Sequence, residues 1–156
     1  MGMTFTRRGQ SKKVERHGKV FQSTTEADFY SALLRMGVEF TWQQEFILQP
    51  GVPKDKKVLL LSGAGVHKIK CTADFVFDDK DGNPCIVDTK GSKDFATERS
   101  TMAYHLLKGA IYRSETGYPP MITKILMIDR KEVLTLLKLS SNPSLFWDYF
   151  NKLTPF

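Results

Sequence analysis

The chain has 156 residues, of which 41% are hydrophobic and 12% aromatic, and it carries a formal charge of +6. This length suits one packed domain and is short for two, so we expect a single domain over residues 21–156. No window of about eighteen consecutive apolar residues is present, and the first residues lack the apolar core of a secretory signal. We therefore expect no membrane span and no export, and place the protein in the cytoplasm.

The positive charge is concentrated in the first twenty residues. Six of these are basic and one is acidic, whereas residues 21–156 carry seventeen basic and sixteen acidic side chains. Little apolar content and many Gly, Ser, Lys and Arg residues predict a flexible basic arm over residues 1–20, and such an arm binds phosphates by releasing counterions. The competing interpretation is a solubilising tail. Four cations of the arm are candidate contacts to nucleic acid: Arg7, Arg8, Lys12 and Lys13.

Ordered structure is predicted to begin at Ser23. Ser23 to Glu26 has the spacing of a capping box, and the apolar residues that follow recur at helical spacing until Gly37. Residues 38–48 alternate between apolar and polar side chains, which is the period of a half-buried strand. A short strand over residues 58–61 and a turn over residues 62–65 are predicted next.

A β-hairpin is predicted in the middle of the chain. Residues 67–77 and 85–90 read as strands, and the Asp, Gly, Asn and Pro residues between them have the composition of a turn. Cys71 and Cys85 lie in these apolar runs, and no CxxC pair is present to hold zinc. We expect both cysteines to be buried, reduced thiols.

The rest of the chain is predicted to alternate helix and strand. A helix is expected over residues 95–113, a strand over residues 122–128, a helix from a capping box at Asp129 through Leu139, and a short helix opened by Asn142. The apolar stripe of the first of these helices is predicted to consist of Met102, Ala103, Leu106, Leu107, Ala110 and Ile111. The pattern predicts an α/β (α+β) fold without internal repeats.

The candidate chemistry centres on Asp88, Thr89 and Lys90. Alternate residues of a strand share a face, so Asp88 and Lys90 are expected side by side. The hairpin turn could bring Asp74 close to Asp88, although sequence does not fix the register. Two adjacent carboxylates repel each other, and a hard divalent cation removes that repulsion. Together with the Thr89 carbonyl they predict an open site for Mg²⁺ or Mn²⁺.

Such a site is suited to phosphoryl chemistry. The cation polarises a phosphoryl oxygen and lowers the pKa of a bound water, while Lys90 orients that water or stabilises the developing charge. Glu26 would complete the site from the first helix, but the spacing alone favours a helix-capping role for it. Asp88 and Lys90 likewise have a competing interpretation, namely an exposed salt bridge of little energetic consequence.

Four segments carry a resemblance to a known family: residues 25–30, 42–51, 72–75 and 87–91. They resemble the blocks of a phage-encoded family of small PD-(D/E)xK nucleases, related to phage endonuclease I and other Holliday junction resolvases. The resemblance runs over residues 21–113. It implies a restriction-endonuclease-like core, a mixed β-sheet flanked by helices in the order αβββαβ. The residues that match the family's acidic and lysine positions are Glu26, Asp74, Asp88 and Lys90.

Two further comparisons with that family concern supporting residues. Gln43 matches a glutamine in the block before the core strand, which implies a supporting role near the site. The helix after Gly91 carries several lysines in such proteins, whereas residues 97–107 here offer only Arg99. Lys93 and Lys108 are the candidates to replace them on the DNA backbone.

The sequence therefore predicts a metal-dependent endodeoxyribonuclease, with branched DNA as a candidate substrate. A homodimer is expected because two strands must be cut symmetrically. The alternative is a non-catalytic DNA-binding module that retains the fold, and a nuclease for RNA or foreign DNA is a third reading. The three histidines are scattered over unrelated elements, so neither a zinc site nor a histidine-based nuclease is expected.

Overall fold

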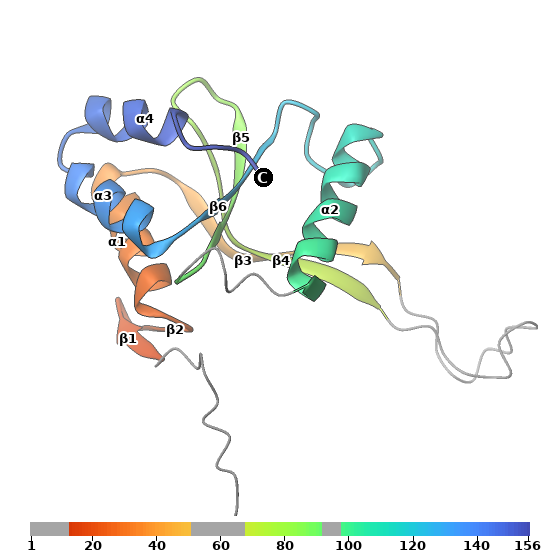
Figure 1. The fold of residues 1–156 in the computed structure, drawn as a ribbon, viewed down its shortest axis with the longest axis horizontal. Helices are drawn as coiled ribbons and strands as arrows, with labels where there is room; N and C mark the ends of the chain where they lie inside the picture. The colour runs from red at the N-terminus through yellow and green to blue at the C-terminus, as the bar shows by residue number, and fades with distance from the viewer. Residues whose placement is uncertain (1–12, 51–67, 92–97) are drawn as a thin grey trace, which may run out of the picture. The chain divides into compact units, whose positions relative to one another are not determined.

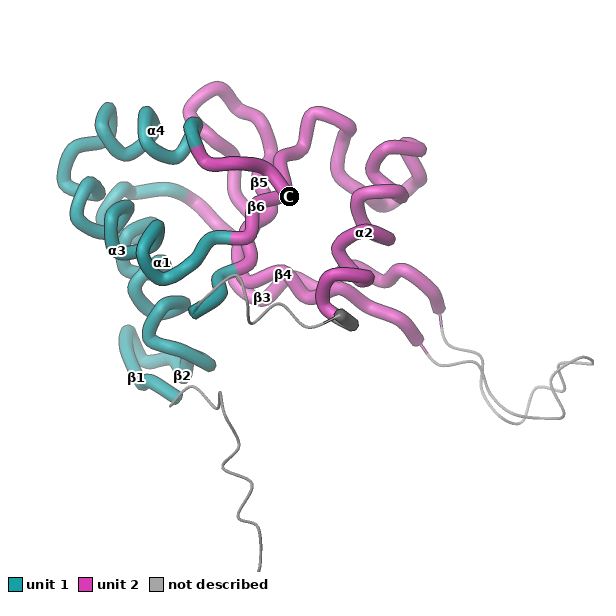
Figure 2. Tube along the Cα trace, in the orientation of Figure 1, with its two compact units in different colours: residues 1–38, 89–95, 128–152 teal, residues 39–88, 96–127, 153–156 magenta. Residues whose placement is uncertain are grey.

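The computed structural model describes residues 13–50, 68–91 and 98–156 (Figure 1). The predicted strand over residues 58–61 and the turn over residues 62–65 lie outside these ranges. The chain divides into two compact units, shown in different colours in Figure 2. Unit 1 consists of residues 1–38, 89–95 and 128–152, and unit 2 of residues 39–88, 96–127 and 153–156.

Unit 1 begins with a hairpin that the sequence did not predict. Strands β1 (Val14–Arg16) and β2 (Lys19–Phe21) pair antiparallel around His17 and Gly18, both of which have positive φ. Two such residues form the tight turn that suits a hairpin. Residues 14–20 were assigned to a flexible arm, so ordered structure begins earlier than expected. Strands of three residues are too short for an alternating pattern to reveal them.

The hairpin is fastened to the first helix, α1 (Thr24–Met36). The guanidinium of Arg16 forms an ion pair with the carboxylate of Asp28 at 2.6 Å, and Phe21 is completely buried. The capping signals of α1 are confirmed: the Ser23 hydroxyl accepts from the Glu26 N–H, and Gly37 ends the helix with φ of +68°. Left-handed backbone at that position is what favours glycine.

Two more helices complete unit 1. Helix α3 (Arg130–Leu139) begins with the predicted capping box of Asp129 and Glu132, and α4 (Pro143–Asn151) begins with Asn142 as its N-cap. Helix α1 packs on α3, and α3 packs on α4. The Arg35 guanidinium donates to the Leu137 carbonyl and thereby joins the end of α1 to that of α3.

A four-stranded mixed sheet makes up much of unit 2. Its order is β3-β4-β5-β6, and both β3–β4 and β4–β5 are antiparallel. The predicted hairpin is therefore confirmed, with Phe75 paired to Val87 and Phe77 to Cys85. The strands are β3 (Phe40–Gln49), β4 (Ile69–Asp78), β5 (Pro84–Thr89) and β6 (Lys124–Ile128).

Asp79 holds the hairpin turn together and ties it to β6. Its buried carboxylate accepts from the N–H groups of Asp81 and Asn83, each at 2.9 Å, and pairs with the Lys124 ammonium at 3.2 Å. Burial raises the pKa of this carboxyl, but the two N–H groups and Lys124 outweigh burial and leave the pKa below its ordinary value. The turn aspartate therefore has a structural role.

Helix α2 (Glu98–Tyr112) packs on β3 and β4, but not with the stripe that was predicted. Met102 and Leu106 are 59% and 46% exposed, whereas Tyr104 joins Leu107 and Ile111 in the core. Those three residues follow helical spacing, and the face containing Tyr104 turns toward the sheet. The prediction was wrong in this respect because tyrosine was not counted among the apolar positions.

Other fold predictions agree with the structure. Cys71 and Cys85 are buried thiols outside any disulfide, and burial raises the pKa of the Cys85 thiol to about 12, which makes it unreactive. From α1 to β6 the elements follow the predicted order αβββαβ, and the fold is of the mixed α and β class. In the ranges that the structure describes, no helix is long and apolar enough to cross a membrane.

Candidate active site

Asp74 and Asp88 are neighbours on the two central strands of the sheet. The β4–β5 ladder ends with Phe75 paired to Val87, and continuing that register by one residue would set Asp74 opposite Asp88. Directly opposed residues have Cβ atoms about 5 Å apart, and like charges there repel. Asp74 is half-buried and Asp88 is only 4% exposed. The sequence left this register open, and the ladder now fixes it as far as Phe75 and Val87, one residue short of the two aspartates.

Gln43 supports Asp74 from strand β3. Its neighbours Trp42 and Gln44 pair with Phe75 and Ala73, so Gln43 lies across from Asp74. The Gln43 Nε2 donates to the Asp74 Oδ1 at 3.5 Å, a long hydrogen bond. The backbone of Gln43 has φ of +59°, which is uncommon for a residue with a side chain and unusual within a strand. Strain of this kind is concentrated at functional sites.

Tyr104 of helix α2 lies near Asp88, and the sequence analysis did not single it out. Its ring is 2% exposed, and its hydroxyl donates to the Thr72 carbonyl at 3.3 Å. Burial is the main cause that raises the pKa of Tyr104, and the charge of Asp88 is the next. A buried tyrosine needs a partner for its hydroxyl, and that requirement was the available signal.

Thr89 and Lys90 follow Asp88 directly and are part of unit 1. Thr89 is buried at the end of β5, and Lys90 is half-exposed. The Lys90 N–H donates to the Ile128 carbonyl at 2.8 Å, so the chain continues alongside β6 beyond the last residue of β5. The main chain around the Asp88 to Lys90 triplet is therefore held by hydrogen bonds.

Glu26 is buried in unit 1, where it acts as a helix cap. Its Oε2 accepts from the N–H of Gln22 at 2.9 Å, and its own N–H donates to the Ser23 hydroxyl at 3.1 Å. The Ser23 half of the predicted capping box is confirmed, whereas the Glu26 carboxylate accepts from Gln22, one residue before the N-cap. Its participation in a metal site with Asp74 and Asp88 stays a prediction, because those residues are part of unit 2.

The donor set at the two aspartates matches the needs of a hard cation. Magnesium binds through one or two carboxylates and keeps several waters, and the main-chain carbonyl of Thr89 is the third predicted oxygen. Within the described ranges, no group of three His, Cys, Asp or Glu side chains could hold a metal ion. A site with two carboxylates would thus depend on main-chain and water oxygens for the rest of its coordination.

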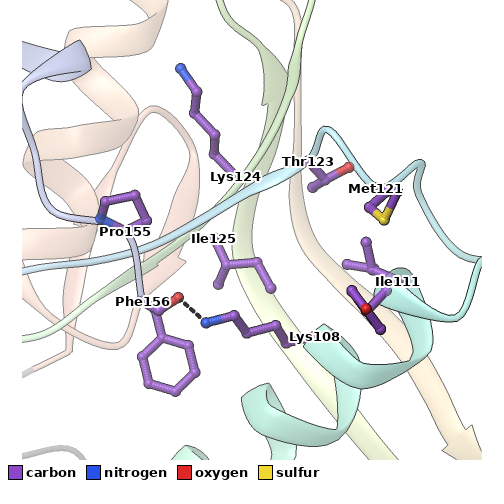
Figure 3. Close-up of a pocket in the computed structure, with 9 residues that line it drawn as sticks. Lys108, Ile111, Met121, Thr123, Lys124, Ile125, Pro155 and Phe156 are labelled. Atoms are coloured by element: carbon purple, nitrogen blue, oxygen red, sulfur yellow. Dashed lines mark hydrogen bonds between the residues drawn. The ribbon is translucent and has the colours of Figure 1, made fainter.

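Only some of the residues that were predicted to contact phosphates lie in the described part of the chain. Lys13 is exposed, whereas Arg7, Arg8, Lys12, Lys93 and the side chain of Arg99 lie outside the description. Lys108 is engaged elsewhere: its Nζ donates to the Phe156 carbonyl at 2.7 Å and lies 5.7 Å from the centre of the Phe156 ring (Figure 3). It lines a cavity of about 320 Å³ that contains no predicted catalytic residue.

Comparison with known proteins gives a family. Residues 7–116 match the model of a family described as a protein of unknown function (DUF1064). The chain belongs to this family. The DUF1064 match includes every predicted site residue and also Tyr104, and it ends before β6. No curated protein and no solved structure matches the chain.

Proposed function

We propose that this DUF1064 protein is a metal-dependent endodeoxyribonuclease of the PD-(D/E)xK type. The observation that carries the proposal is the antiparallel register of β4 and β5. Continued one residue beyond Phe75 and Val87, it sets Asp74 opposite Asp88, directly before Thr89 and Lys90. In a purely structural role, two facing carboxylates with little access to water would destabilise the sheet. A bound cation would offset this repulsion, and a hydrogen bond from Gln43 already orients the Asp74 carboxylate.

Each residue has a defined task in the proposed reaction. Asp74, Asp88 and the Thr89 carbonyl would hold the cation, which would polarise a phosphoryl oxygen and make a water more acidic. Lys90 places a compact positive charge beside the phosphate, where negative charge develops during attack. Gln43 keeps Asp74 in position. Glu26 keeps its capping contact, and the family resemblance implies that it would also serve the metal site.

The proposed DNA substrate and the proposed homodimer rest on the family resemblance and on the basic residues of the chain. The segments shared with phage junction resolvases, together with the order αβββαβ, favour DNA, with branched junctions as the preferred form. The basic residues at the start of the chain supply affinity for phosphates that depends on salt. A homodimer would allow both strands of a junction to be cut symmetrically.

The proposal is tested with a panel of end-labelled substrates: a four-way junction, a linear duplex, a single strand and an RNA. The full chain is incubated with Mg²⁺ beside two variants, Asp88→Asn and Asp78→Asn. Asp78 is an exposed aspartate at the end of β4 and serves as the control. We expect cutting of DNA, strongest on the junction, by the parent and the control only. Binding without cutting by the parent would instead indicate the non-catalytic DNA-binding module.

A further inference from the structure

We infer that the cavity of unit 2 drawn in Figure 3 is a binding site for one unpaired nucleotide of a DNA strand. The base would enter the cavity, and the Lys108 ammonium would bind the phosphate. The inference rests on the proposed function and adds to it the form of DNA that the chain recognises. The size of the cavity, its lining, its charge and its connection to strand β4 support it.

The cavity is small and mostly apolar. Its volume is about 320 Å³, and every residue that lines it is part of unit 2. Ligand pockets measure roughly 300–1,000 Å³ and combine an apolar lining with a few polar groups. A volume at the lower end of that range suits one ring system with a short substituent. The apolar and aromatic part of the lining consists of Ile111, Tyr112, Met121, Ile125, Pro155 and Phe156.

The part of the wall formed by Phe156 is held in place by three contacts. The Phe156 N–H donates to the Ile125 carbonyl at 2.7 Å, and the Phe156 carbonyl accepts from the Lys108 Nζ at 2.7 Å. The Phe156 ring meets the Tyr104 ring edge-on, with 6.0 Å between the centroids. A wall that is already fixed loses little conformational freedom when a ligand binds.

Two large side chains that line the cavity face the solvent. Tyr112 is 75% exposed and Met121 is 61% exposed. Exposed apolar surface gathered beside a pocket is typical of a binding site, whereas single exposed residues are common everywhere. An aromatic ring can stack on any nucleobase, because every base has a π-face. Tyr112 and Met121 therefore offer a surface against which a base can pack.

The charge of the lining favours an anion. Among the described residues that line the cavity, two are lysines and none is acidic. The Lys124 ammonium pairs with the Asp79 carboxylate at 3.2 Å, which largely compensates its charge. The Lys108 ammonium has three N–H donors, and the Phe156 carbonyl uses one of them. The remaining donors can bind a phosphate. A planar ring joined to a phosphate is the chemistry of a nucleotide.

The cavity is linked to the strand that carries Asp74. The Tyr104 ring contacts Phe156, and the Tyr104 hydroxyl donates to the Thr72 carbonyl of β4 at 3.3 Å, two residues before Asp74. A DNA strand with one nucleotide in the cavity would therefore be held on the same unit as the proposed metal site. Unpaired nucleotides occur at branches and bulges and are absent from a continuous duplex, so such a cavity would favour irregular DNA.

The test measures the affinity of the full chain for three end-labelled DNAs by fluorescence anisotropy, without divalent cations so that no DNA is cut. The first is a continuous duplex, the second carries one bulged deoxyadenosine nucleotide, and the third carries an abasic residue at the bulge. The third keeps the bulge and its phosphate but lacks the base. We expect the parent to bind the second about 5- to 150-fold more tightly than the third, the usual effect of stacking one base.

Two variants assign this preference to the cavity. Tyr112→Ala should remove most of the preference for the base, because it removes an exposed aromatic ring. Lys108→Gln should weaken the binding of both bulged DNAs and lower the salt dependence by about one counterion. The controls are Met102→Ala, at a 59% exposed position of the same helix, and Lys80→Gln, at an exposed position of the hairpin turn. Neither control residue lines the cavity, so both should behave like the parent.

The outcomes separate this inference from the nuclease proposal. Equal affinity of the parent for the bulged base and the abasic bulge would overturn the inference, and so would an undiminished preference in Tyr112→Ala. Binding of free deoxyadenosine monophosphate as tight as that of the bulged DNA would overturn the assignment to a DNA strand. None of these results bears on cutting in Mg²⁺. A preference for the base that depends on Tyr112, in a chain that cuts no DNA, would support the cavity while the proposed function fails.

Discussion

Gln43 donates to Asp74 from a backbone in the left-handed region, with φ of +59° in the middle of strand β3. A side chain in that conformation costs roughly 1–2 kcal/mol relative to ordinary backbone. The strained backbone lowers the stability of the fold, so stability does not explain a glutamine at position 43. The hydrogen bond to Asp74 explains it if the Asp74 carboxylate must be oriented toward a ligand.

This relationship predicts a conflict between stability and activity at position 43. Gln43→Gly should be more stable than Gln43→Ala by about 1 kcal/mol, because glycine adopts positive φ without strain. Both variants should cut DNA more slowly than the parent, since both lack the amide donor. Urea unfolding and single-turnover cutting measure the two effects. Equal stability of the two variants would show that the left-handed backbone carries no strain.

Glu26 and Glu132 form a natural matched pair, because each accepts from a main-chain N–H at the start of a helix. Glutamine can replace either as a cap, so Glu26→Gln and Glu132→Gln should each change the free energy of unfolding by less than about 1 kcal/mol. We expect only Glu26→Gln to lose cutting, because only that variant removes a charge from the proposed site. Parent-level cutting by Glu26→Gln would limit Glu26 to capping.

Lys90 is predicted to act on the phosphate and not on the cation. Lys90→Ala should lower the rate of cutting at least about 100-fold, the usual effect of removing one group that stabilises a transition state. Its affinity for Mn²⁺ should remain near that of the parent. Lys80→Ala, at an exposed position of the hairpin turn, is the control. A Lys90→Ala variant that cuts at the parent rate contradicts the assignment.

Asp79 gives a prediction about pH and stability. The N–H groups of Asn83 and Asp81 and the Lys124 ammonium together outweigh burial and lower the pKa of this carboxyl below its ordinary 3.8. Its stabilising contribution is therefore complete above about pH 4 and is lost as the pH falls through the lowered value. Asp79→Asn should be less stable than the parent at pH 7, and the difference should shrink toward pH 2 in urea titrations. A difference independent of pH would contradict this.

Local signals in the sequence predicted much of the fold. Ser23, Gly37 and Asp129 mark helix ends because capping chemistry depends on neighbours in the chain, and the turn after Phe77 specified the hairpin. The β1–β2 hairpin escaped notice because strands of three residues leave no periodicity. Met102 and Leu106 were misplaced because which face of α2 is buried depends on the sheet against which it packs.

The candidate site was predictable only in part, for a similar reason. Asp74, Asp88 and Lys90 stand out through their spacing on two strands, and the antiparallel ladder runs to within one residue of the two aspartates. Tyr104 lies sixteen residues after Asp88, on a helix, so nothing local relates them. Its position near the site depends on how α2 packs against β4, which is a tertiary contact.

The central claim is that Asp74 and Asp88 share a divalent cation, and calorimetric titration with Mn²⁺ tests it most directly. The parent chain should bind Mn²⁺ with a measurable heat, and Asp74→Asn and Asp88→Asn should each weaken binding by more than about 10-fold. Asp78→Asn should bind like the parent. Equal affinity in all four proteins, or no binding by the parent, would contradict the account.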